Sequence, residues 1–111
     1  MRALRVEGLP ADPLAAAAAF YAQWLGQLPS REGEDVAIVF PPADHTHRGW
    51  RLAVVQGLAR AHAPLRVNAV ASDSSTAIAA ALAYLEAAPG LTGQLLTLDD
   101  AGAGVVIDCP A

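Results

Sequence analysis

Two periods of hydrophobic residues alternate along this chain. Period-two alternation or continuous apolar runs, which are typical of strands, occur at 3–9, 35–40, 65–71 and 94–98. Apolar residues at helical spacing lie between these runs, and they predict helices over 12–28, from about 49 to 62 and over 75–89. A final apolar run at 105–107 predicts either a short last strand or an apolar tail.

Strands alternating with helices predict an α/β fold. We expect a three-layer half-Rossmann arrangement, with a mostly parallel sheet of four to five strands, about three helices and right-handed crossovers. The continuous run Asp35–Phe40 is typical of a central strand covered on both faces. At 111 residues, we expect 1–111 to be a single domain.

The first predicted helix carries two apolar stripes. Leu14, Ala17/Ala18, Tyr21, Leu25 and Leu28 follow helical spacing on one face. Phe20 and Trp24 form a second stripe beside it, so the apolar arc is wide. Two interpretations remain open: the helix packs only on the sheet, or it packs one face on the sheet and another on a partner.

Composition narrows the function classes. Hydrophobic residues make up 54% of the chain and charged residues 16%, a balance typical of proteins that bury surface against another subunit. The net charge of −4 argues against binding to nucleic acid or to an anionic membrane. The alanine run at 15–19 is too short to span a bilayer, and Met1 to Arg5 does not begin a signal peptide. We expect a cytoplasmic protein in which Cys109 is a free thiol.

One segment and its surroundings resemble a known family. Arg66-Val67-Asn68-Ala69-Val70-Ala71, preceded by Gly57-Leu58-Ala59-Arg60-Ala61, is similar to the catalytic helix and following strand of short-chain dehydrogenases/reductases, especially β-ketoacyl-ACP reductases. The stretch 80–85 resembles the family's penultimate helix, and 90–99 resembles its final loop and strand. Residues 20–28 and 35–40 are similar to the helix and strand that lead to the catalytic serine. The resemblance covers the C-terminal half of a typical member, which implies a truncated relative.

The chemistry implied by this resemblance is missing. The family binds its nucleotide with a glycine-rich loop after the first strand, whereas Gly102-Ala103-Gly104 lies near the C-terminus and is expected to be a turn. The family's reaction uses a serine, a tyrosine and a lysine. Pro41-Pro42-Ala43 stands at the serine position, Tyr21 and Tyr84 lie on other helices, and all seven basic residues are arginine. We therefore expect a degenerate pseudoenzyme with no cofactor and no dehydrogenase active site of its own.

Retained packing residues beside lost chemistry suggest an assembly role. In the family, the two helices that flank the serine strand form the dimer bundle. The corresponding candidate interface residues here are Phe20, Trp24, Trp50 and Val54. The leading hypothesis is a homo-oligomer, or a complex with a full-length reductase-like protein, in which this chain is a non-catalytic subunit.

The alternative is a small ligand- or metal-binding protein, or an enzyme, that uses the polar loop after the second strand. Asp44, His45, His47 and Arg48 form this alternative site, and a third metal ligand such as His62 would have to fold in. The need for this additional ligand favours a solvated loop. Arg48 and Arg51 flank Trp50, and either grip an anion or lie on a surface helix. Asn68 is expected to bond a neighbouring strand or loop.

Overall fold

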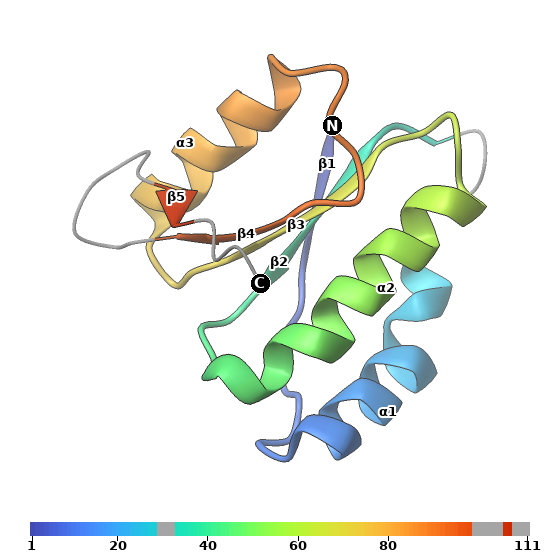
Figure 1. The fold of residues 1–111 in the computed structure, drawn as a ribbon, viewed down its shortest axis with the longest axis vertical. Helices are drawn as coiled ribbons and strands as arrows, with labels where there is room; N and C mark the ends of the chain where they lie inside the picture. The colour runs from blue at the N-terminus through green and yellow to red at the C-terminus, as the bar shows by residue number, and fades with distance from the viewer. Residues whose placement is uncertain (29–32, 99–105, 108–111) are drawn as a thin grey trace.

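The computed structural model describes residues 1–28, 33–98 and 106–107, which form one sheet with helices on both faces (Figure 1). The elements in chain order are β1 (Arg2–Arg5), α1 (Pro13–Gln23), η1 (Leu25–Gln27), β2 (Val36–Phe40), η2 (His45–His47), α2 (Arg48–Ala61), β3 (Val67–Ala71), α3 (Ser75–Glu86), β4 (Leu95–Leu98) and β5 (Val106–Ile107), where η1 and η2 are short 3-10 turns.

The sheet has five strands in the order β1-β2-β3-β4-β5. The first four are parallel, and β5 pairs antiparallel with β4 through Thr97–Ile107 and Leu98–Val106. The α/β half-Rossmann prediction is therefore confirmed. The last apolar run contributes a strand rather than a tail, whereas Gly102 to Gly104 and Cys109 lie outside the described residues.

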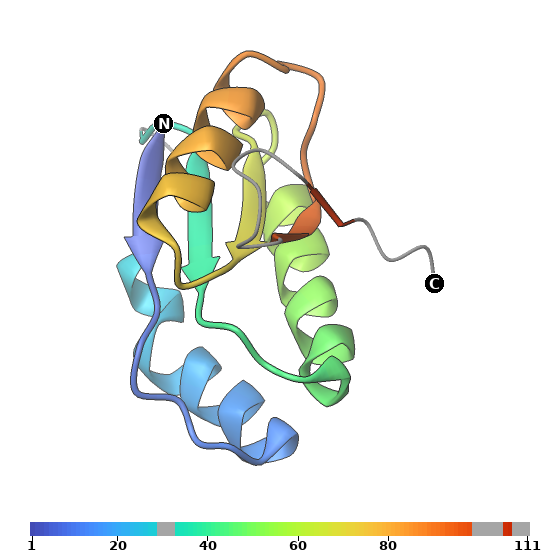
Figure 2. The same cartoon turned by 90° about the vertical axis from the view of Figure 1, so that its left-hand side faces the viewer.

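The helices form two outer layers. Helices α1 and α2 cover one face of the sheet and α3 covers the other (Figure 2). The strands lie in the sheet in the same order as in the chain. A connecting helix on the opposite face of the sheet therefore gives a crossover of the opposite hand. The crossover through α3 therefore has the opposite hand to the other two. The expectation that every crossover is right-handed is wrong.

The larger hydrophobic core lies between the sheet and helices α1 and α2. Its centre is an aromatic cluster in which the rings of Phe20, Phe40 and Trp50 lie 5.5 to 5.8 Å apart between centroids. Every residue of β2 is buried, as expected for a strand covered on both faces. A smaller core joins Val39 and Val70 of the sheet to Ile78 and Leu85 of α3. The sheet is therefore packed against helices on both of its faces.

Helix α1 packs on the sheet through the stripe of Phe20 and Trp24, not through the stripe that begins at Leu14. Phe20 is fully buried and Trp24 packs against the core, whereas Leu14 is 81% exposed, Tyr21 49% and Leu25 38%. The sequence identified both stripes and left open which of them faces the sheet; the structure places the Phe20 stripe inward and leaves Leu14, Tyr21 and Leu25 exposed. The helix packs through its larger aromatic side chains because these fill the space against Phe40 and Trp50.

Local capping decides where the elements begin and end. The side chains of Asp12, Asp44 and Ser74 each accept a hydrogen bond from a backbone N–H in the first turn of α1, η2 and α3. The predicted strand 3–9 is shorter, with β1 ending at Arg5, because Gly8 adopts a φ of +78° and turns the chain toward α1.

Candidate functional site at the carboxyl edge of the sheet

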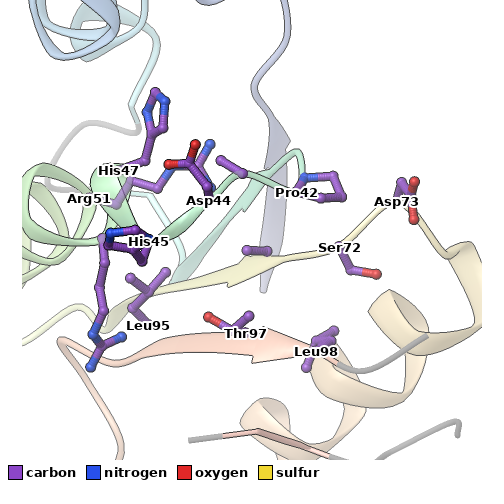
Figure 3. A pocket seen from close by; sticks show the side chains of 13 residues that line it. Pro42, Asp44, His45, His47, Arg51, Ser72, Asp73, Leu95, Thr97 and Leu98 are labelled. Atoms are coloured by element: carbon purple, nitrogen blue, oxygen red, sulfur yellow. The ribbon is translucent and has the colours of Figure 1, made fainter. Parts of the chain in front are cut away.

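A cavity of 450 Å³ opens where β2, β3 and β4 end. Its walls come from the segment after β2, the start of α2, the segment after β3, and β4 (Figure 3). Parallel α/β sheets place ligands at this edge because the loops there leave a crevice. The polar residues lining it are Asp44, His45, His47, Arg48, Arg51, Ser72, Asp73 and Thr97.

Asp44 is committed to the fold of its own loop. Its carboxylate accepts hydrogen bonds from the hydroxyl and the backbone N–H of Thr46. These two bonds, the hydroxyl first, hold the pKa of Asp44 below its ordinary value of 3.8. The residue is exposed and stays ionised, so it supplies a negative charge at the rim of the cavity.

His47 is buried and both of its ring nitrogens are occupied. Trp50 Nε1 donates to His47 Nδ1 at 3.0 Å, and His47 Nε2 lies 2.9 Å from the carbonyl oxygen of Ala11. An indole nitrogen only donates, so Nδ1 accepts and Nε2 carries the proton that is given to Ala11. His47 therefore clamps α2 to the segment before α1, and it has no free nitrogen for a metal.

The histidines predicted as metal ligands are not brought together. His45 is exposed at the cavity, the ring of His47 is turned away from Ser72 and Thr97 (Figure 3), and His62 lies at the opposite end of α2. Among residues 1–28, 33–98 and 106–107, no three His, Cys, Asp or Glu side chains are grouped to hold a metal ion. The metal alternative therefore loses two of its three histidines.

Arg51 is buried, although its charge is typical of a surface position. Its side chain is 95% buried rather than on the surface, since only 5% of the residue is exposed. Nη1 donates to the carbonyl oxygen of Pro41 at 2.9 Å, and the guanidinium carbon lies 4.5 Å from the centroid of the Phe40 ring. The buried Nε has no hydrogen-bond partner. Burial lowers the pKa of Arg51 to about 10, which leaves it charged at neutral pH.

The helical spacing of α2 contained a signal for this burial. Arg51 lies three, four and seven residues before Val54, Val55 and Leu58, all of which are buried. It therefore belongs to the core-facing stripe of the helix, and the cation has to sit beside the sheet.

Ser72 and Asp73 line the cavity from the end of β3. Ser72 is buried and its Oγ accepts the backbone N–H of Ser74 at 3.0 Å, while Asp73 is exposed. Thr97 lines the same cavity from β4, with Leu95 and Leu98 beside it. The cavity thus combines an apolar wall on β4 with a buried cation on α2.

A family model described as short chain dehydrogenase-like protein (SDR-like) matches residues 4–98. The chain belongs to this family. No curated protein and no solved structure matches it. The match begins within β1 and ends with β4, so it covers the three helices, the cavity and all of the parallel sheet except the first two residues of β1.

The SDR-like domain places the predicted interface residues in two environments. Phe20 and Val54 are buried in the larger core and have no surface to offer a partner in this conformation. Trp24 and Trp50 are partly exposed and pack against that core. In the described part of the chain, no helix is both long enough and apolar enough to cross a bilayer.

Proposed function

We propose that this SDR-like protein is a non-catalytic assembly subunit that pairs with a second copy of itself through the outward face of α1. The observation that carries the proposal is the exposed apolar stripe formed by Leu14 and Tyr21 of α1 and by Leu25 of the adjoining turn η1. A partner that covers these side chains would remove apolar area from water, which is the main driving force of association.

The stripe is continuous and uncharged. Its members lie seven and four residues apart on the chain, and the exposed alanines 15, 18 and 22 fill the space between them. Helix α1 carries no charged side chain at all. A helix that is apolar all round is typical of an element buried on both sides, yet the sheet covers only one side of α1.

A second copy suits this face better than an oppositely charged partner. The stripe has no charge to select such a partner, and two copies of an uncharged helix bring no like charges into direct contact, although each chain has a net charge of −4. Small and large side chains alternate along the stripe, which allows two copies to interdigitate about a twofold axis. A reductase-like protein carrying an equivalent helix is the other possible occupant.

The residues around the cavity support a non-catalytic role. Neither Tyr21 nor Tyr84 lines it, and the chain has no lysine to pair with a tyrosine acid. Carboxylates of Asp12 and Asp44 cap α1 and η2, so a phosphate approaching either N-terminus would meet a like charge. The edge of the sheet is thus poorly suited to a dinucleotide.

Native mass spectrometry and light scattering of the purified chain test the proposal. We expect a dimer for the wild type and a monomer for the double variant Leu14→Glu/Tyr21→Glu. Tyr84→Glu is the matched control, because Tyr84 is 54% exposed on α3, on the other face of the sheet. A wild-type monomer at high concentration, or a dimer that survives the double variant, would contradict this proposal. Binding or turnover of NADPH would contradict the non-catalytic role.

A second candidate function is ligand binding in the 450 Å³ cavity. The observation that favours it is Arg51, a buried cation that lines the cavity without a carboxylate partner among the described residues. Direct titration of ligands tests it independently of the oligomeric state.

A further inference from the structure

We propose that the cavity binds a small monocarboxylate with an apolar body, and that Arg51 receives the carboxylate. This inference rests on the second candidate function and is independent of assembly through α1. It develops one of the two interpretations that the sequence left open for Arg51, namely that this residue grips an anion.

Arg51 is a buried cation whose hydrogen-bond donors are only partly used. A buried guanidinium is costly unless its donors are used, because burial removes the water that would otherwise solvate the charge. Here Nη1 has the Pro41 carbonyl, Nε has no partner, and the ring of Phe40 supports one face of the group. No carboxylate in the described residues lies within ion-pair distance of Arg51. An incoming anion would supply the missing countercharge.

Arg51 also borders open volume. It lines the 450 Å³ cavity and also a neighbouring cavity of 280 Å³, on the side of α1. A volume of 450 Å³ lies within the range of small-molecule sites. The planar fork of arginine matches a carboxylate better than a single-point donor does.

The charges around the cavity favour a ligand that carries a single negative charge. Asp44 and Asp73 carry negative charge at the rim of the same cavity, and the lowered pKa of Asp44 keeps it ionised. These charges repel a phosphate dianion about twice as strongly as a monocarboxylate, because the Coulomb energy scales with the charge. The attraction of Arg51 doubles for the dianion as well, whereas the cost of removing an ion from water grows with the square of its charge. A single negative charge is therefore the better match for this buried cation.

The apolar wall of the cavity favours a ligand with an apolar body. The wall formed by Ala71, Leu95 and Leu98 is apolar, and Pro42 and Ala43 close the side after β2. Only Thr97 interrupts this wall with a hydroxyl on β4. A hydrophobic group attached to the carboxylate would be removed from water against these side chains.

Isothermal titration calorimetry with benzoate and benzamide tests the proposal, because the two probes share a shape and differ in charge. We expect wild-type protein to bind benzoate at least about tenfold more tightly than benzamide. Inorganic phosphate is titrated as the third probe, and we expect it to bind more weakly than benzoate. Equal binding of benzoate and benzamide, or no binding of benzoate, would overturn the proposal. Phosphate binding as tight as benzoate would overturn the choice of a carboxylate.

The variant Arg51→Met removes the charge while keeping much of the apolar stem. We expect benzoate to bind at least about tenfold more weakly to this variant, with benzamide unchanged. Arg60→Met is the matched control, since Arg60 is exposed on the same helix and does not line the cavity. Benzoate affinity unchanged in Arg51→Met would sink the assignment. If that variant fails to fold, the contrast between benzoate and benzamide on the wild type still decides the outcome.

Discussion

Trp50 donates its indole N–H to Nδ1 of His47 across 3.0 Å, and this hydrogen bond gives the histidine a structural role. The other nitrogen, Nε2, is then the one that holds the proton and reaches Ala11. The polar loop predicted as an alternative site is thus divided between two roles. His47 faces α1 as a structural clamp, while His45 remains exposed at the cavity.

We predict that His47→Ala destabilises the protein and that His45→Ala does not. Loss of the imidazole leaves Trp50 Nε1 and the Ala11 carbonyl without partners, which is expected to lower the free energy of unfolding by about 1–3 kcal/mol. His45→Ala is expected to change it by less than about 0.5 kcal/mol. Urea denaturation with and without zinc measures both effects. Stabilisation of the wild type by stoichiometric zinc, lost in both variants, would show that the loop is a metal site after all.

The ion pair between Asp35 and Arg66 predicts a pH dependence. Asp35 accepts the backbone N–H of Arg66 at 2.8 Å and its Nε–H at 2.9 Å, and Arg66 also donates to the last carbonyls of α3. The hydrogen bond from the Arg66 backbone is the main cause that lowers the pKa of Asp35 below 3.8. A depressed folded-state pKa stabilises the protein above the ordinary value, and this stabilisation is lost as the pH falls through the folded-state pKa.

Asp35→Asn is therefore expected to lower the free energy of unfolding by about 1–3 kcal/mol at neutral pH. The difference from wild type should stay constant above the ordinary pKa and shrink as the pH falls below 3.8. Denaturation series at several pH values measure this difference. Glu7→Gln, an exposed site with the same change in net charge, is the control and should differ little from wild type at neutral pH. A difference that grows on acidification would reverse the sign of the argument.

Neighbouring residues on α1 are predicted to act on different properties. Phe20→Ala opens a cavity beside Phe40 and Trp50, and we expect a loss of about 3–5 kcal/mol in the free energy of unfolding. Tyr21→Ala, at an exposed position, is expected to cost less than about 1 kcal/mol in the monomer and to weaken assembly instead. Measuring unfolding at low protein concentration and oligomeric state at high concentration separates the two. Equal destabilisation of the monomer by both would mean that the stripe is part of the fold.

Asn68 is predicted to hold β3 to the segment before β4. It is buried, its Nδ2 donates to the carbonyl oxygen of Leu91 at 3.0 Å, and its Oδ1 accepts the N–H of Gln94 at 3.0 Å. The sequence-based expectation for this residue is confirmed. Asn68→Ala should lower the free energy of unfolding by about 1–3 kcal/mol and speed hydrogen exchange of the Gln94 amide, whereas Gln56→Ala on the exposed side of α2 should do neither. Unchanged exchange at Gln94 would contradict the assignment.

The sequence by itself determined the order of the elements and the parallel sheet. These follow from short-range rules, namely the period of the apolar residues and the side chains at helix ends, which operate within a few residues. The residues quoted for the family resemblance all lie within or next to the matched region 4–98, because the match depends on local sequence as well. The more specific likeness to β-ketoacyl-ACP reductases stays a prediction.

Only the tertiary structure decided which stripe of α1 points inward. The two stripes of α1 are both apolar, so their periodicity does not distinguish Phe20 from Tyr21, and packing against Phe40 and Trp50 makes the choice. The spacing of Arg51 from Val54 and Val55 indicates the core-facing stripe of α2, but its charge suggests a surface position, and only the structure shows that the residue is buried. The opposite hand of the α3 crossover is likewise invisible in the pattern. Each of these features depends on contacts between segments far apart in the chain, and the hydrophobic pattern of one segment does not record what that segment will meet.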